Sequence, residues 1–165
     1  MDMRVFDLFK IGVGPSSSHT VGPMVAARRF LVEAGNLQNV TKVQAALYGS
    51  LALTGSGHAT DKAVLLGLMG ETPQDVAPDT IEDKLARLSE THQMRLLGEY
   101  AISFNPATDI IWHMQEVLPG HPNGMKLMLT RQDGSVHEQV FYSTGGGFIY
   151  TEAELSSNDK VSTDS

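Results

Sequence analysis

The sequence predicts an α+β fold, a two-layer domain in which helices pack on a mostly antiparallel sheet. Helical periodicity dominates the first half of the chain, whereas short runs of alternating apolar residues fill the second half. Helices followed by antiparallel strands are typical of this fold class. The length of 165 residues suits one well-cored domain and is too short for most two-domain enzymes.

The first helix and the first strand are marked by their periodicity and their ends. After a short amphipathic opening at residues 5–9, apolar residues recur at helical spacing from Pro23. Gly35 is expected to end this helix as its C-cap. Residues 43–48 then alternate in the manner of a half-buried strand, which is expected to end at Gly49.

Two further helices are predicted before the middle of the chain. Residues 62–69 are apolar nearly all round, so this helix is expected to be buried. A linker at residues 73–78 precedes a solvated helix that Asp79 or Thr80 can cap. The apolar stripe of that helix consists of Ile81, Leu85 and Leu88.

The second half of the chain reads as short strands and turns. Residues 100–112 contain two apolar strands on either side of a turn at residues 105–106. Residues 125–129 alternate as another strand, and the Asp-Gly pair at 133–134 predicts a primed hairpin turn into a returning strand at 136–144. These strands supply the antiparallel layer.

The end of the chain differs from the rest in composition. It is rich in Ser, Thr, Asp and Glu and shows no periodicity. We therefore assign residues 1–150 to the domain and residues 151–165 to a flexible tail or linker.

Composition excludes several classes of protein. The net charge of −7 and a pI near 5.2 argue against a nucleic-acid surface and favour a small polar metabolite as partner. The sequence has neither a membrane-spanning apolar run nor a signal peptide's apolar core, which predicts a cytoplasmic protein. The chain has no cysteine, so it contains no disulfide, thiol nucleophile or thiolate-bound metal centre.

The most informative stretch, residues 12–23, reads G-V-G-P-S-S-S-H-T-V-G-P. It gathers hydroxyls and a histidine just before a predicted helix, whose free N–H groups and positive dipole end favour a carboxylate or phosphate. A simpler reading is that Ser18 or Thr20 only caps the helix. A cap needs one hydroxyl, however, and this run supplies four.

Three other clusters combine glycine or proline with polar groups, at residues 56–61, 121–124 and 143–147. We expect all of them on loops, where scaffolds usually display function. His58 is the best candidate for a general base, because the start of a buried helix favours a neutral imidazole and Asp61 is close enough in sequence to orient the ring. The alternative is a histidine that only forms a hydrogen bond within a turn.

Other catalytic signatures are missing from the sequence. There is no nucleophile elbow, phosphate-binding P-loop, H-E-x-x-H zinc motif or complete dinucleotide fingerprint. Hydrolase, P-loop and Rossmann functions are therefore disfavoured. His92, His113 and His137 are interpreted as surface or strand residues.

Taken together, residues 5–24, 48–58, 60–61, 123–125 and 142–149 closely resemble the iron–sulfur L-serine dehydratases of bacteria. The second of these stretches reads Y-G-S-L-A-L-T-G-S-G-H. The match runs in order along nearly all of the domain and is most similar to the beta domain of the single-chain form.

The resemblance implies an enzyme that converts L-serine to pyruvate and ammonia without pyridoxal phosphate. In that family a four-iron, four-sulfur (4Fe-4S) cluster acts as a Lewis acid on the serine hydroxyl, and its cysteines belong to a separate alpha domain. The full-length enzyme is expected to be a homodimer. Because this chain has no cysteine, the chain alone is expected to be inactive.

Two functional hypotheses follow from the resemblance. In the first, the polar loops complete a cleft with the alpha domain, and His58 removes the α-proton. In the second, the chain is a regulatory module that binds serine or another small anion, like the similar allosteric substrate-binding domain of some phosphoglycerate dehydrogenases. The substrate-binding residues implied are Ser16, Ser17, Ser18, His19, Thr20, Thr60, Asp61, His121, Asn123, Ser143, Gly145, Gly146 and Gly147.

Overall fold

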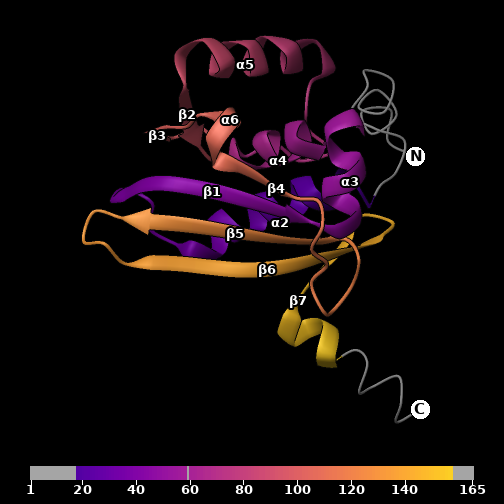
Figure 1. Ribbon diagram of the computed structural model, residues 1–165. Coiled ribbons are helices and arrows are strands. Elements are labelled where there is room, and N and C mark those ends of the chain that lie inside the picture. The colour runs from indigo at the N-terminus through magenta and orange to yellow at the C-terminus, as the bar shows by residue number, and fades with distance from the viewer. Residues whose placement is uncertain (1–17, 59, 158–165) are drawn as a thin grey trace.

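A five-stranded sheet with helices packed on it forms the molecule (Figure 1). The computed structural model describes residues 18–58 and 60–157, with the side chains of residues 54–58 outside that description. The elements are α2 (Val21–Ala34), β1 (Val40–Tyr48), α3 (Gly49–His58), α4 (Thr60–Leu68), α5 (Pro78–Thr91), β2 (Gln93–Leu96), β3 (Tyr100–Ser103), α6 (Pro106–Asp109), β4 (Ile110–His113), β5 (Gly124–Arg131), β6 (Val136–Gly145) and β7 (Phe148–Thr151).

The sheet has the strand order β4-β1-β5-β6-β7, and β2 and β3 form a separate pair. Only the β1–β4 contact is parallel, and β1–β5, β5–β6 and β6–β7 are antiparallel. The predicted α+β class with a mostly antiparallel sheet is confirmed. The opening element expected at residues 5–9 lies outside the described residues.

One face of the sheet carries the core. Val43, Ala45 and Leu47 alternate along β1 and are fully buried. Their partners Leu127 and Leu129 on β5 are buried on the same side. Alternation therefore directs every second side chain of the sheet toward α2 and α4.

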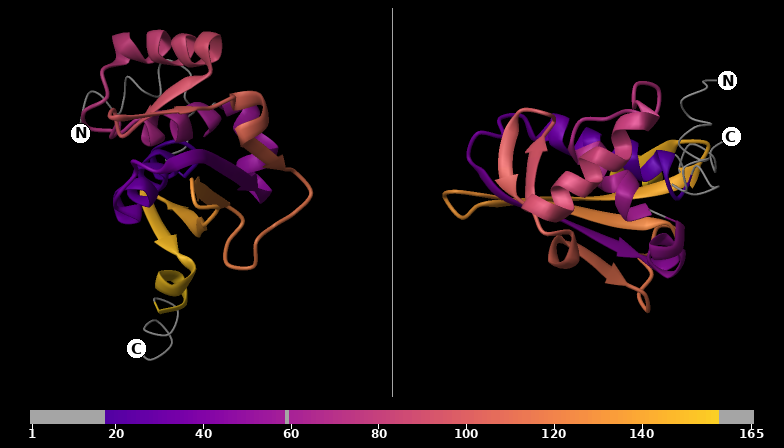
Figure 2. Two further views of the ribbon diagram at one scale, coloured as in Figure 1. Left: turned by 90° about the vertical axis from the view of Figure 1, so that its left-hand side faces the viewer. Right: turned by 90° about the horizontal axis from the view of Figure 1, so that it is seen from above.

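The helices above this face pack closely. A Cβ atom at Gly67 of α4 would collide with the carbonyl oxygen of Met24 on α2, so the absent side chain lets the two backbones approach. Figure 1 and the left view of Figure 2 both show α5 as the outermost element, beyond the β2–β3 pair. As predicted, α4 is buried along its length, and Ile81 and Leu88 of α5 are buried.

Helix ends agree with the sequence only in part. Gly35 ends α2, as predicted, and its N–H donates to the Val32 carbonyl. Thr20 occupies the N-cap of α2, but its side chain makes no capping hydrogen bond to the helix. At α5 the N-cap is Ala77 rather than Asp79 or Thr80, because Pro78 at the first position already has the helical φ.

The predicted turns form at the expected places with different geometry. Gly134 has φ +87°, whereas Asp133 does not have a positive φ, so the β5–β6 hairpin is not a primed turn. The Gly134 N–H donates to the Arg131 carbonyl, and Arg131 N–H to the Ser135 carbonyl, each at 2.9 Å. This is a three-residue connection with a glycine bulge. The turn expected at 105–106 is the start of α6, which the Asn105 side chain caps.

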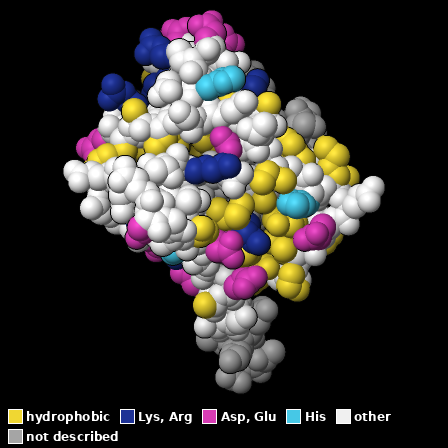
Figure 3. Space-filling view, turned by 60° about the vertical axis from the view of Figure 1, so that its left-hand side comes forward, with side chains coloured by type: hydrophobic (Ala, Val, Ile, Leu, Met, Phe, Trp, Pro, Cys, Tyr) yellow, Lys and Arg dark blue, Asp and Glu magenta, His cyan; other side chains and the backbone are white. Residues whose placement is uncertain are grey.

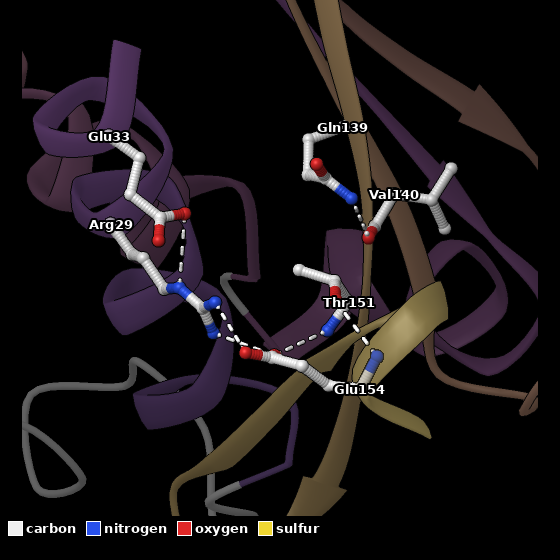
Figure 4. A network of polar contacts seen from close by, with 6 residues as sticks. All are labelled: Arg29, Glu33, Gln139, Val140, Thr151 and Glu154. Atoms are coloured by element: carbon white, nitrogen blue, oxygen red, sulfur yellow. Dashed lines mark hydrogen bonds and ion pairs between the residues drawn. The ribbon is translucent and has the colours of Figure 1, made fainter. Parts of the chain in front are cut away.

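The segment after β7 is helical over residues 152–157, where the sequence predicts irregular backbone. The physical reasons are a capping box, in which Thr151 and Glu154 bond each other's backbone N–H groups, and an anchor of Glu154 on α2 (Figure 4). Both guanidinium Nη atoms of Arg29 donate to the Glu154 carboxylate, at 3.0 and 2.7 Å. The Thr151 N–H donates to the same carboxylate at 3.0 Å. Residues 158–165 lie outside the described residues, so the predicted linker role stays a prediction.

This anchor predicts a pH-dependent attachment of residues 152–157. Arg29 lowers the pKa of Glu154 from 4.5 to about 2. A lowered carboxyl pKa means that the ion pair stabilises the fold fully above pH 4.5 and is lost as the pH falls toward about 2. Because the pair is exposed, Glu154→Gln should speed amide exchange of residues 152–157 only about two- to five-fold at neutral pH. Hydrogen exchange with mass spectrometry measures this rate.

Glu33→Gln is the matched control. Glu33 also contacts Arg29, at 3.2 Å, but lies on α2 itself, so its loss should leave residues 152–157 protected. Equal exchange in the two variants would contradict the anchoring role of Glu154.

Candidate functional site

The His19 imidazole connects the start of α2 to the start of α3. Its Nδ1 atom is 2.9 Å from the Ser18 hydroxyl, and its Nε2 atom is 3.0 Å from the Ser50 hydroxyl. A neutral imidazole has one donor and one acceptor nitrogen, so one serine accepts from the ring and the other donates to it. The ring is therefore oriented from both sides.

The start of α3 is held by the loop that precedes β5. Gly49 N–H donates to the Glu116 carbonyl at 2.8 Å, and Ser50 N–H to the Pro122 carbonyl at 3.0 Å. Gly49 has φ +55°, and a Cβ atom there would collide with the Pro122 carbonyl oxygen. Only glycine fits this approach. Two N–H groups that a helix start leaves unsatisfied are thus paired within the protein.

The same loop is also hydrogen-bonded to β6, through Asn123. The Asn123 side-chain amide donates to the Ser143 carbonyl, and Ser143 N–H donates to the Asn123 carbonyl, each at 3.0 Å. Asn123 N–H also donates to Nδ1 of His121 at 3.0 Å. Since Nδ1 of His121 accepts, its ring proton is on Nε2. Three sequence clusters are therefore joined by hydrogen bonds.

The glycine turn between β6 and β7 belongs to the same sequence cluster as Ser143. A Cβ atom on Gly147 would lie 3.1 Å from a methyl group of Val21, which places this turn against the first residue of α2. Gly145 and Gly146 precede it in the same turn. We call the residues that meet here the polar cluster: Ser18, His19, Thr20, Ser50, His121, Asn123, Ser143 and Gly145–Gly147.

Two buried hydroxyls near these motifs have no hydrogen-bond partner in the described part of the chain. They are Oγ of Ser143 and Oγ1 of Thr60, with side chains 1% and 0% exposed. A buried unpaired hydroxyl costs on the order of 1–3 kcal/mol. Burial also raises the pKa of Asp61, although the Lys62 N–H opposes this shift. Such costs are typical of functional sites.

His58 is placed differently from the sequence prediction. Residues 56–58 are helical rather than a loop, and His58 is the last residue of α3, with one residue between it and α4. Burial of Leu51 and Ala52 and the loop hydrogen bonds at the start of α3 stabilise this helix despite its glycines. The backbone of His58 is about 12 Å along the axis from Ser50.

His58 lies two residues before the start of the buried helix α4, as predicted, but it is also the last residue of α3. The end of α3 favours a protonated imidazole, whereas the start of α4 favours a neutral one. The His58 side chain and the predicted site residues Ser16 and Ser17 lie outside the description. Ser50 is the site residue that sequence reasoning missed, and its position just after a strand-ending glycine was the available signal.

The remaining histidines take structural positions. His92 is the C-cap of α5, while His113 stacks on Tyr48 at 4.4 Å and His137 on Phe30 at 5.4 Å between ring centroids. Within the described residues, no three His, Asp or Glu side chains are grouped to hold a metal ion. No helix in those residues has the length and apolarity to cross a membrane.

These features define an α+β domain in which the candidate residues of the polar cluster gather at one end of the sheet. A family model described as serine dehydratase beta chain matches residues 4–154. The chain belongs to this family.

Curated relatives agree with the family model. The L-serine dehydratase of Streptomyces coelicolor is 46% identical over 92% of this chain and 34% of its own length. L-serine dehydratase TdcG of Escherichia coli is 42% identical over 98% of this chain and 36% of its own. The Mycobacterium tuberculosis enzyme is 44% identical over 92% and 34%. The chain thus spans about a third of the length of these relatives.

The close approach at Gly49 predicts a large effect of one methyl group. Gly49→Ala should lower the free energy of unfolding by about 2–4 kcal/mol, because it adds a backbone collision to the strain of a positive φ. Gly134→Ala is the matched control, since Gly134 has φ +87° with no atom near a Cβ. Urea unfolding should show a clearly larger loss for Gly49→Ala, and equal losses would contradict the packing.

The buried carboxyl of Asp61 predicts a stabilising substitution. A raised carboxyl pKa means that ionised Asp61 destabilises the folded state above the ordinary pKa of an aspartate. Asp61→Asn should therefore raise Tm at neutral pH, and this gain should disappear in acid. Asp83→Asn, at an exposed position on α5, should change stability by less than about 0.5 kcal/mol. A Tm for Asp61→Asn at or below wild type at pH 7 would refute the burial cost.

Proposed function

We propose that this chain is the beta domain of an iron–sulfur-dependent L-serine dehydratase, which converts L-serine to pyruvate and ammonia. Its polar cluster forms one wall of an active-site cleft, and an alpha domain supplies the other wall. The observation that carries the proposal is the convergence of four motifs that lie far apart in the sequence, through the His19–Ser50, Ser50–Pro122 and Asn123–Ser143 contacts. The family assignment and the names of the relatives support it.

The residues of this chain do not fit a four-iron, four-sulfur cluster. Such clusters are held by thiolates, and the chain has no cysteine. The ligands must come from outside these residues, which agrees with a chain that spans a third of its relatives. The contribution of this chain is therefore to bind the substrate and transfer protons.

The polar cluster and the neighbouring motifs of the sequence offer suitable groups for both tasks. His19, oriented by Ser18 and Ser50, can donate a hydrogen bond to a substrate carboxylate once one serine turns away. His121 presents an Nε2 proton, and Ser16, Ser17 and Thr20 add hydroxyls in the same segment. His58 is the proposed base for the α-proton of serine, and Asp61 orients its ring.

The loss of stability caused by two unpaired hydroxyls supports the proposal that a ligand or another domain completes this site. Thr60 and Ser143 keep buried hydroxyls without partners in the described chain. A protein evolved only for stability would replace them with apolar groups of similar size, because an unpaired buried hydroxyl weakens the fold. Substrate or alpha-domain groups that reach these hydroxyls in the complete enzyme would remove that penalty.

The test uses a full-length chimera in which this chain replaces the matched third of the Streptomyces coelicolor enzyme. His58→Ala should lower kcat for serine by at least about 100-fold, the scale of a lost general base. His19→Ala should raise KM with a smaller effect on kcat, because a positioning hydrogen bond is lost. His137→Ala, an exposed histidine on β6, is the control and should retain wild-type turnover.

The outcomes separate the two functional classes. Wild-type turnover of His58→Ala with altered cooperativity toward serine would overturn the active-site role and identify a regulatory binding module. Serine dehydration by the pure 165-residue chain would contradict a site divided between two domains.

A further inference from the structure

The face of the sheet opposite the helices has no covering layer in the described chain. In Figure 1, strands β1, β5 and β6 lie in front of α2, and only the loop before β5 crosses them. Register identifies the side chains on this face, because Ala46 pairs with Ile111 and Lys126, one residue out of phase with the core-facing Ala45. Every second residue of the sheet thus points away from the helices.

Apolar side chains extend across this face. Ile111, Met128, Val140 and Tyr150 come from four different strands, are only partly buried, and lie outside the buried core. Met114 and Val117, in the loop after β4, are 46% and 62% exposed. Figure 3 shows hydrophobic side chains gathered on one face with charged groups among them. We call these residues the open face: Ile111, Met114, Val117, Met128, Val140 and Tyr150.

The open face is continuous with the polar cluster. Tyr48 and His113 stack on this side of the sheet, and Tyr48 is followed directly by Gly49 and Ser50. The loop that carries Met114 and Val117 also supplies the Glu116 and Pro122 carbonyls that hold α3. A partner seated on the open face would therefore reach the edge of the cluster.

The opposite side of the molecule is a poor alternative for docking. Its outermost helix, α5, exposes Glu82, Asp83, Arg87 and Glu90 to solvent and turns its apolar stripe inward. Stable interfaces have cores depleted of charged residues and enriched in apolar and aromatic ones. The open face carries Lys126 and Glu138 among its apolar side chains and comes closer to this description than the outer side of α5.

We propose that the open face is the surface on which the alpha domain docks. This proposal rests on the proposed function. About two thirds of each relative lies outside the part that this chain matches. That remaining length must pack against this domain to complete a shared site, and the open face is an apolar surface that adjoins the polar cluster. Contiguous exposed apolar surface of this kind marks interaction sites in soluble proteins.

Hydroxyl-radical footprinting of methionines tests the location directly. Oxidation of Met114 and Met128 is compared between the isolated 165-residue chain and the full-length chimera. We expect at least about five-fold slower oxidation of both in the chimera. Met69, which is also partly buried but lies at the end of α4, should oxidise at the same rate in both.

Substitutions provide a second readout. Met128→Glu in the chimera should expose Met114 to oxidation again and reduce serine turnover at least about ten-fold. Val32→Glu, at a 49% exposed position on α2, is the control and should change neither. If Met128→Glu fails to fold, the wild-type footprint still decides the question.

The remaining outcomes separate the two proposals. An active chimera in which Met114 and Met128 stay as reactive as in the isolated chain would overturn the docking face and leave the proposed function intact. Protection in an inactive chimera would support the face and count against the function. A dimer of the isolated chain, detected by sedimentation, with both methionines protected would overturn the alpha domain as occupant in favour of a second copy.

Discussion

The meeting of the end of β1 with the loop before β5 is the contact on which the candidate site depends. Gly49 permits it, because any side chain there would collide with the Pro122 carbonyl. The paired N–H groups of Gly49 and Ser50 fix the first turn of α3, and that turn presents the Ser50 hydroxyl to His19. The last residue of the same loop, Asn123, donates a hydrogen bond to the Ser143 carbonyl on β6. One backbone approach thus assembles residues from four distant segments.

The two faces of the sheet and its end carry different kinds of residues. Its inner face supplies the core with side chains such as Val43 and Leu127, which are fully buried. The polar cluster occupies the end of the sheet and contains the buried Ser143 hydroxyl, which has no partner among the described residues. At the start of α4, the Thr60 hydroxyl also lacks a partner among those residues, and Asp61 is desolvated. The outer face carries the apolar side chains of the open face, and no layer of the described residues covers it. This distribution agrees with a domain whose chemistry is completed by another part of a longer enzyme.

The spacing of apolar residues predicts a helix or strand correctly where the element is defined by its own apolar pattern. The stripe of α5, the buried length of α4 and the alternating strands β1 and β5 are of this kind. The same spacing does not predict elements and site residues that depend on tertiary contacts. Helix α3 contains three glycines, Gly49, Gly55 and Gly57, and is stabilised by the burial of Leu51 and Ala52 and by the loop carbonyls bound to its first turn. Strand β2 has two apolar residues and owes its form to pairing with β3. Ser50 became a site residue through partners 31 and 72 positions away, which no local pattern encodes.

The central claim is that the segment around His19 is fixed to the start of α3, so that separate motifs form one site. A double-mutant cycle with His19→Ala and Ser50→Ala, read from the free energy of unfolding in urea, tests it most directly. A hydrogen bond between the two side chains predicts an interaction free energy of about 0.5–1.5 kcal/mol. Additive losses, with an interaction free energy below about 0.3 kcal/mol, would contradict the contact and the assembly built on it.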